Sequence, residues 1–499
     1  MSDLTLLVLT DVHFLHAAQA LPSSVNRQCD LGVEMLRRAA KDARRLGGFD
    51  AVALLGDLLD GGRAPGVELD AAELARAVNE ALGDVPRVVA PGNHDGDPQV
   101  LLSALGDRPG LHEVGGYRLY SFVDAWDASD VCRRPPSSME RFVEDARTGA
   151  DKPLIVLQHN PLWPPIQSDY PYMLSDAERV MKAYAEAGVV LSLSGHYHHG
   201  QTLSVRAGVH YWTGGALSDS PFRYALVRLD GRALTIEERA LKLPEDLPLW
   251  DVHAHTHYAY CSEDVTPQES IRRARLFGLS GVCLTEHSDQ LYLTREECLS
   301  GRAFTDDDFW CAPRSDESER MPRYRAEVEP LRSDYVKLGV EIELDRVGRP
   351  ALRAGHRQGW DLMMGAVHWI PGGVEGRSDH ELCRAFMENT EAVLRSGVQV
   401  LAHPFRFFRR YKRPQPKELY RPVVEMLARC GAAAEINFHT NDPDVEFFAM
   451  CVRSGVKIAL GSDAHNLLEV GDFYPHLELL RSAAHRHDVS DLVFHGPWA

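Results

Sequence analysis

Several features that would identify a class of protein are missing from this sequence. The nine cysteines are scattered and none forms a Cys-x-x-Cys pair, so neither a disulfide framework nor a zinc ribbon is indicated. No apolar run is long enough to cross a bilayer, and the first residues lack the basic segment and the cleavage site of a signal peptide. We therefore expect a cytoplasmic protein without a membrane partner.

Positive charge is also scarce, because the formal net charge is -18. Broad, non-specific binding to nucleic acid or to anionic membranes needs a basic surface, so the acidic surplus argues against both. The chain of 499 residues is too long for one hydrophobic core and has the length of two large domains. Its hydrophobic content of 44% is ordinary for a globular protein.

The chain divides at residues 241–249. This stretch has two prolines, an acidic pair and neither helical nor alternating periodicity, which is typical of a linker. Residues 1–240 and 250–499 each begin with a predicted strand that leads into aspartate and histidine side chains. We predict two α/β domains, each with a metal site at the carboxyl ends of its strands.

In residues 1–240, five predicted strands each deliver a side chain that can bind a metal. The strands are Leu4–Leu9, Ala51–Leu55, Arg87–Ala90, Leu154–Leu157 and Val189–Leu193. Two close divalent cations need a bridging carboxylate, hard oxygen ligands and imidazoles, and such a pair can clamp a phosphate and activate water. His94 lies between Asn93 and Asp95, which suits a histidine that a carboxylate orients toward a leaving-group oxygen. A lone histidine is more often a surface or core residue, but five ordered motifs at strand ends are not explained in that way.

The order of these motifs resembles the calcineurin-like metallophosphoesterase family over residues 1–240. The resemblance implies a four-layer αββα sandwich that binds two metals (Mn, Fe or Zn) and hydrolyses a small phosphodiester, such as a cyclic nucleotide. It also implies that Asp57 bridges the metals, that His94 acts on the leaving group and that Asp95 is the partner of His94. The positions that match metal ligands are Asp11, His13, Asp57, Asn93, His159, His196 and His198.

In residues 250–499, predicted strands alternate with helical patterns, which indicates parallel βα units closed into a barrel. A helical segment is predicted from Tyr324 to Leu338, followed by a strand from Gly339 to Leu344. The polar stretch from Ser288 to Met321 is predicted as a surface insertion or lid, and a solvated loop is the alternative.

The order of motifs here resembles the PHP (polymerase and histidinol phosphatase) family over residues 248–499, and within it the histidinol-phosphatase-like members. This resemblance implies a distorted (β/α)7 barrel with two or three metals (Mn, Zn or Fe), bridged by Glu341, that hydrolyses a phosphomonoester. The histidine expected for a third metal is missing, and Cys261, Glu263 or His257 would have to replace it. The positions that match metal ligands are His253, His255, His287, Glu341, His368, His403, Asp463 and His465.

Residues 405–413 hold five basic and four aromatic side chains directly after His403. Arginine beside a metal site can hold a substrate phosphate through two hydrogen bonds, and Arg406 is nearest to the ligand in sequence. Mixtures of basic and aromatic side chains also stack the bases of single-stranded nucleic acid. A solvated loop is the third interpretation.

The leading hypothesis is a bifunctional phosphoesterase that acts on small molecules, first on a phosphodiester and then on a phosphomonoester. A metal-dependent nuclease for single-stranded nucleic acid is the enzymic alternative, which the net charge of -18 disfavours. A non-catalytic sensing or binding protein is the other alternative, against which stands the His94–Asp95 pair. The sequence indicates no oligomeric state.

Overall fold

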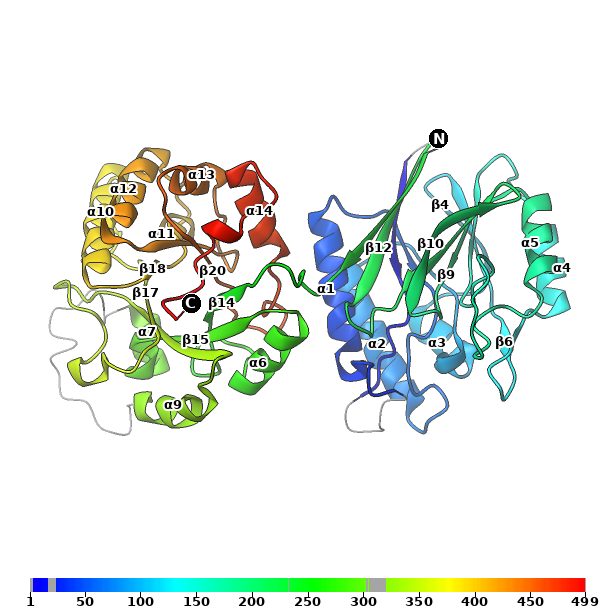
Figure 1. Cartoon of the computed structure of the whole chain (residues 1–499), viewed down its shortest axis with the longest axis horizontal. Helices are drawn as coiled ribbons and strands as arrows, with labels where there is room; N and C mark the ends of the chain where they lie inside the picture. The colour runs from blue at the N-terminus through cyan, green and yellow to red at the C-terminus, as the bar shows by residue number, and fades with distance from the viewer. Residues whose placement is uncertain (1–2, 17–23, 232, 302–303, 305–319, 499) are drawn as a thin grey trace. The chain divides into compact units, whose positions relative to one another are not determined.

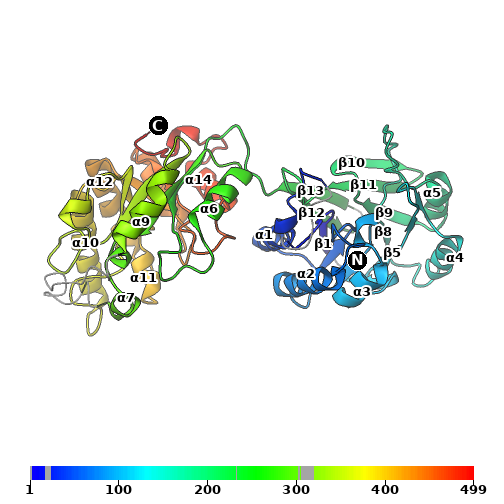
Figure 2. The ribbon, with the colours of Figure 1, turned by 90° about the horizontal axis from the view of Figure 1, so that it is seen from below.

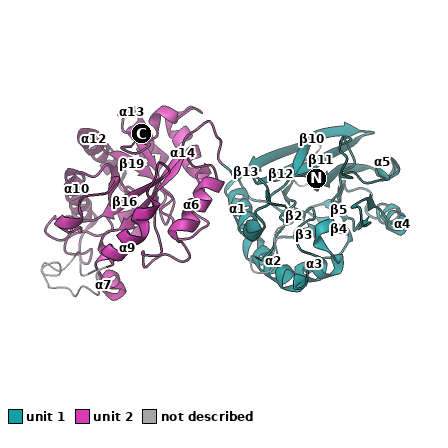
Figure 3. Ribbon diagram, turned by 60° about the horizontal axis from the view of Figure 1, so that its bottom comes forward, with its two compact units in different colours: residues 1–242 teal, residues 243–499 magenta. Residues whose placement is uncertain are grey.

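The computed structural model describes residues 3–16, 24–231, 233–301, 304 and 320–498. The chain divides into two compact units, residues 1–242 and 243–499 (Figure 3). The segment predicted as a linker is partly buried, because Leu243, Leu247 and Leu249 pack into the hydrophobic core of the second unit. In the described part of the chain, no helix combines the length and the apolar character needed to cross a membrane.

The first unit contains two large sheets that pack face to face, and a short sheet of β6 (Ala125–Trp126) and β7 (Cys132–Arg133). In spatial order, the five-stranded sheet consists of β13 (Ala233–Ala240), β12 (Arg223–Asp230), β1 (Leu4–Leu9), β2 (Ala51–Leu54) and β3 (Arg87–Val89). The six-stranded sheet consists of β10 (His199–Arg206), β11 (Val209–Gly215), β9 (Val189–Ser194), β8 (Leu154–Leu157), β5 (Tyr117–Ser121) and β4 (Gly110–Val114).

Helices cover the outer faces of both sheets (Figures 1 and 2). One group is α1 (Gly32–Arg45), α2 (Val67–Leu82) and α3 (Pro98–Leu105), and the other is α4 (Pro136–Asp145) and α5 (Ala177–Glu186). Strands β1, β2 and β8 are continuous apolar runs because they are buried on both faces. Val8 and Leu157 belong to the hydrophobic core between the sheets, whereas Phe142 and Tyr184 belong to a second core on the outer face of the six-stranded sheet. This arrangement confirms the predicted four-layer αββα sandwich.

The second unit contains one sheet of seven parallel strands. In order, they are β14 (Trp250–Ala254), β15 (Gly281–His287), β16 (Val336–Ile342), β17 (Leu362–Gly365), β18 (Val400–Leu401), β19 (Ala433–Ile436) and β20 (Ile458–Leu460). An isolated parallel bridge between Ala254 and Ala464 links the first strand to the residues that follow the last one. The sheet therefore curves into the predicted distorted (β/α)7 barrel.

Helices follow the strands and surround the barrel (Figure 1). They are α6 (Pro267–Leu276), α7 (Arg295–Ser300), α9 (Met321–Val328), α10 (Asp379–Arg395), α11 (Arg406–Arg410), α12 (Tyr420–Cys430), α13 (Val445–Arg453) and α14 (Tyr474–Ala484). Helix α6 has a capped start, because the Thr266 hydroxyl accepts a hydrogen bond from the Glu269 N–H (3.3 Å) and Pro267 occupies the first turn.

Two predictions in this unit need comment. The helical segment predicted to run to Leu338 is wrong, because α9 ends at Val328 and β16 already begins at Val336. Pro330 lies in the 3-10 turn after α9, where its ring and missing N–H end the helix. Of the insertion predicted from Ser288 to Met321, residues 302–303 and 305–319 lie outside the described residues.

Candidate metal centres

The first unit brings the predicted ligands together at the ends of its strands. The groups that form include Asp11–His13–His198, Asp57–His159–His196 and His13–Asp60–His94, and within each group the possible ligand atoms lie within 4.8 Å of one another. Asp57 Oδ2 lies 3.3 Å from His159 Nε2 and 3.6 Å from His13 Nε2, so Asp57 joins the first two groups. Asn93 lies beside these groups, because the backbone N–H of the next residue, His94, donates a hydrogen bond to Asp57 Oδ1 (2.8 Å).

Oxygen acceptors around the cluster orient its imidazoles. The Nδ1 atoms of His13 and His198 lie 3.0 Å from Asp60 and 2.8 Å from Asp219, and His159 Nδ1 lies 2.7 Å from a backbone carbonyl. An acceptor at Nδ1 places the ring proton there and leaves the Nε2 lone pair facing inward, as metal-binding histidines require. The sequence analysis missed Asp60 and Asp219. Asp60 lies three residues after Asp57, but no local motif points to Asp219.

Three buried atoms of the cluster need a partner. Among the described residues, Asp11 Oδ1, Asn93 Oδ1 and His196 Nε2 are buried and make no hydrogen bond. Leaving such an atom unpaired costs about 1–3 kcal/mol. Burial and the adjacent His159 lower the pKa of His196 to about 3, so this ring is neutral and has a lone pair available. Divalent cations would satisfy these atoms, so the donor set fits a pair of metals.

The backbone at the cluster is strained. Several predicted ligands have a positive φ, which non-glycine residues rarely adopt and which costs about 1–3 kcal/mol each. Gly92 has a related role, because a Cβ atom there would lie 2.3 Å from Asp57 Oδ1. Strain of this kind is concentrated at functional sites. The ligands concerned are Asp11, His13, Asp57 and His196, together with His403 and Asp463 of the second unit.

His94 lies at the edge of this cluster, with 24% of its side chain exposed and its ring 4.8 Å from the His13 ring. Its predicted partnership with Asp95 is corrected by the structure. The two carboxylate oxygens of Asp95 accept hydrogen bonds from the backbone N–H groups of Leu59 (2.9 Å) and Gly92 (2.7 Å). His94 Nδ1 instead lies 3.4 Å from the carbonyl oxygen of Asp60. Adjacent residues in a tight turn point apart, so Asp95 stabilises the turn and Asp60 orients the ring.

Two tyrosines that no sequence pattern indicated lie beside the cluster. The rings of Tyr170 and Tyr172 lie 5.7 Å and 5.5 Å from the His196 ring. The Tyr170 hydroxyl donates to Asp130 (3.3 Å), and 36% of Tyr170 is exposed. The two rings meet at 61°, so each ring by itself offers an apolar face to a bound molecule.

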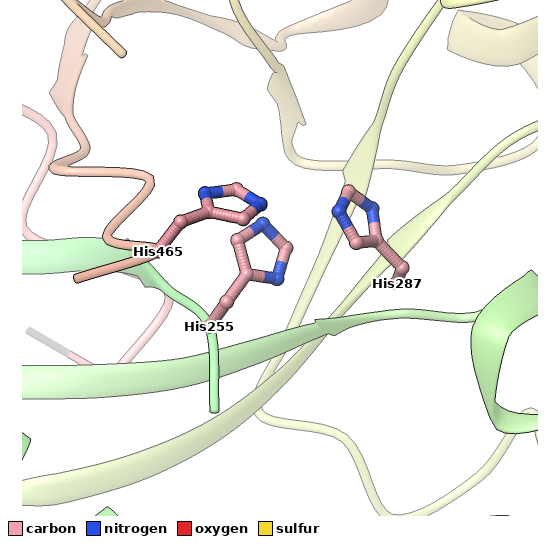
Figure 4. Close-up of side chains that lie close together, drawn as sticks. All are labelled: His255, His287 and His465. Carbon is pink, nitrogen blue, oxygen red and sulfur yellow. The ribbon is translucent and has the colours of Figure 1, made fainter. Parts of the chain in front are cut away.

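In the second unit, the predicted ligands surround Glu341. Its carboxylate lies 2.8 Å from His403 Nε2 and 2.6 Å from His287 Nδ1. His255 Nε2 lies 2.9 Å from Asp463 and 3.1 Å from His253 Nε2. The rings of His255, His287 and His465 converge from different strand ends (Figure 4).

Carboxylates orient these imidazoles as well. His253, His255 and His368 direct Nδ1 at Glu435 (2.8 Å), Glu286 (3.2 Å) and Glu343 (3.3 Å), respectively. The His368 ring lies 4.7 Å from the His403 ring, which places it with the rest of the predicted set. Burial and the nearby Arg406 lower the pKa of His403 to about 4, so this ring is neutral and can bind a metal. The donor set of this cluster therefore also fits divalent metals.

Comparison with known proteins agrees with the two clusters. The calcineurin-like phosphoesterase family model matches residues 4–200, and the PHP domain model matches residues 251–439. The chain joins a calcineurin-like phosphoesterase domain to a PHP domain. Members of both families hydrolyse phosphate esters and depend on divalent metals. The protein is therefore a metal-dependent hydrolase of phosphate esters.

Three relatives illustrate the similarity. The chain is 23% identical over 245 residues to a probable histidinol-phosphatase of Deinococcus radiodurans, covering 44% of this chain and 87% of that protein. A dimetal phosphatase from Danio rerio matches 48% of this chain and 97% of its own, with 13% identity and a TM-score of 0.41. A purple acid phosphatase from yellow lupin matches 48% of this chain and 52% of its own, with 14% identity and a TM-score of 0.37.

Arg406 contacts the cluster of possible metal ligands in the PHP domain, because its Nη1 lies 2.5 Å from Asp463 Oδ2. It lines a cavity of about 490 Å³ together with Arg410, His287 and His465. Residues 406–410 of this segment form helix α11, whereas Lys412 and Arg413 follow it and are exposed. The three phenylalanines of the basic and aromatic run are buried in the core. They are Phe405, Phe407 and Phe408.

His439 also lines this cavity, although it matches no ligand position. Its ring stacks on His465 with centroids 4.2 Å apart, and its Nδ1 lies 2.7 Å from Glu469. Glu469 accepts the backbone N–H of His465 (2.8 Å) as well, so one carboxylate holds both histidines. His439 Nε2 remains available to the cavity.

Proposed function

We propose that the protein is a bifunctional phosphoesterase, in which the calcineurin-like site hydrolyses a small phosphodiester and the PHP site hydrolyses a phosphomonoester. One observation supports this most strongly. Each domain has its own buried carboxylate, Asp57 or Glu341, surrounded by inward-facing imidazole nitrogens. When bound, a pair of divalent cations neutralises charge on the phosphoryl oxygens and activates water for attack.

In the calcineurin-like site, His94 is the group placed to protonate the leaving oxygen. Its Nδ1 faces the carbonyl oxygen of Asp60, which can only accept a hydrogen bond and so keeps one proton on Nδ1. The protonated ring would give the leaving oxygen its second proton, the one on Nε2. The edge position of the ring allows contact with a substrate bound at the cluster. The organic group of the diester would lie against Tyr170 and Tyr172, which suits a planar group such as a nucleobase.

In the PHP site, the cavity of about 490 Å³ is the size of a small-molecule pocket. Arg406 and Arg410 give it positive charge, and Arg410 also lies over the Trp369 ring, 4.6 Å from its centroid. One phosphate and a modest organic group would fill such a space. The monoester product of the first site is a substrate of the class the second site would take, which gives the fusion a chemical reason.

The nuclease alternative loses support from the burial of Phe405, Phe407 and Phe408, because buried rings cannot stack on bases. Arg413 pairs with Asp379 at 3.3 Å, so it is not reserved for a phosphate backbone. These contacts favour a small substrate. His94 does not decide against a sensing protein, because it forms a further group of possible metal ligands with His13 and Asp60.

The experiment that tests this function is a substrate screen of the Mn²⁺-loaded protein. A phosphodiester, a phosphomonoester, a cyclic nucleotide and single-stranded DNA are compared at equal phosphate concentration. We expect turnover of the diester and the monoester that EDTA abolishes. Turnover confined to DNA would support the nuclease, and binding without turnover of any substrate would support the sensor.

A further inference from the structure

A thiol lies beside the histidine cluster of the PHP domain. Cys261 Sγ is 3.7 Å from His287 Nε2 and also accepts a contact from the Gln290 side chain at 3.8 Å. The residue lines the same cavity as His287 and His465. The loop that carries it is fixed to the cluster, because the Glu263 N–H donates to the His465 carbonyl oxygen (2.8 Å).

The other two candidates for the missing third-metal ligand, His257 and Glu263, make different contacts. His257 Nε2 lies 3.4 Å from Glu327, and its ring packs on Tyr258. Glu263 donates its backbone N–H to the carbonyl oxygen of His465. Cys261 is thus the side chain that the loop presents to His287.

The tautomers of the neighbouring histidines direct lone pairs into the same space. His287 Nδ1 lies 2.6 Å from Glu341, which places its proton there and leaves Nε2 facing Cys261. His465 Nδ1 lies 2.7 Å from the Asp463 carbonyl oxygen, which can only accept, so its lone pair is also on Nε2. Ligand nitrogens of His255, His287 and His465 lie within 4.8 Å of one another (Figure 4).

We propose that Cys261, and not Glu263 or His257, replaces the missing third-metal histidine of the PHP domain beside His287 and His465, as a thiolate ligand with a preference for Zn²⁺ or Co²⁺. A thiolate and imidazoles are the ligands that zinc prefers, whereas Mn²⁺ and Mg²⁺ prefer oxygen. Glu341 would then have two roles, since it orients His287 through Nδ1 and lies at the centre of the remaining ligands. The proposal deepens the proposed function, because it rests on metal binding by the PHP cluster.

Cobalt spectroscopy tests this proposal without measuring activity. The full-length protein is stripped of metal and titrated with Co²⁺, and near-ultraviolet absorption is recorded. Thiolate ligands give an intense charge-transfer band there, whereas imidazole and carboxylate ligands do not. The variants are Cys261→Ser and, as a matched control, Cys298→Ser, because Cys298 lines the same cavity.

We expect the band in the wild type and in Cys298→Ser, and its loss in Cys261→Ser, with one Co²⁺ fewer bound per chain. Cys261 is exposed, so the metal-free serine variant should unfold at the wild-type temperature. A wild type without the band, or a Cys261→Ser variant that keeps it, would overturn the proposal. Phosphoesterase activity is a separate reading, so a failure of the proposed function would be recognised by its absence even where the band is present.

Discussion

Asp57 and Glu341 stay ionised although both are buried. Burial alone would raise the pKa of each carboxyl, but the adjacent histidines, His159 beside Asp57 and His287 beside Glu341, outweigh it and hold both pKa values well below the usual range. A bridging ligand must carry this negative charge to hold two cations close together. The charge at these two positions is therefore the feature on which each site most depends.

The first prediction concerns Asp57→Asn. The amide keeps the shape of the side chain but removes the charge, so the calcineurin-like domain should lose both of its metals. The measurement is metal content per chain by mass spectrometry after reconstitution and gel filtration. Asp84→Asn is the control, because Asp84 is exposed. An unchanged metal content in Asp57→Asn would contradict the bridging role.

The second prediction separates His94 from Asp95. His94→Ala should lower kcat about 10²–10⁴-fold on a diester with a poor leaving group and much less on a nitrophenyl ester, because only the poor leaving group needs a proton. Metal content should stay unchanged. Asp95→Asn should instead lower the melting temperature, since Asp95 accepts two backbone hydrogen bonds. An equal loss on both esters in His94→Ala would argue against the acid role.

At the scale of elements, helix α11 is an apolar anchor with a basic surface. Phe407 is buried in the core of the PHP domain, whereas Arg409 on the same helix is exposed. Phe407→Ala should destabilise the PHP domain by about 3–5 kcal/mol. Arg409→Ala should change the stability by no more than about 0.5 kcal/mol. Denaturant unfolding of the full chain, followed through the transition of the PHP domain, checks both, and equal effects would show that the helix is not packed as described.

The same helix gives a prediction about nucleic acid. We expect the wild type to have a low affinity for a short oligonucleotide. Replacing Arg409, Arg410 and Arg413 by alanine should leave this affinity unchanged. A true single-strand site would show a log–log salt slope of about -0.7 for each phosphate contact. The measurement is oligonucleotide and mononucleotide hydrolysis across a salt titration. Faster, salt-sensitive cleavage of the oligonucleotide that the triple variant loses would favour the nuclease.

The elements that carry ligands could be predicted because their signals are local. Leu4–Leu9 is an apolar run that ends two residues before Asp11, and the structure places β1 at these residues. Partners from distant parts of the chain had no such signal. Asp219 meets His198 only because the sheet brings them together, and Glu469 meets His439 in the same way. Edge strands such as β13 alternate between half-buried and exposed residues, so no apolar run indicated them.

At the scale of the whole molecule, each unit has its own hydrophobic core and its own cluster of ligands. The core of the calcineurin-like domain lies between its two sheets, and that of the PHP domain surrounds its barrel. No predicted ligand of one cluster belongs to the other unit. Domains with separate cores can in principle fold and act alone. We therefore expect the two activities to be lost one at a time.

The measurement that tests the central claim most directly is the hydrolysis of one diester and one monoester by four proteins. They are the wild type, Asp57→Asn, Glu341→Ala and the double variant, all reconstituted with Mn²⁺. The account predicts that Asp57→Asn loses the diesterase and keeps the monoesterase, that Glu341→Ala does the reverse, and that the double variant has neither activity. Loss of both activities in either single variant, with that variant still folded, would contradict it.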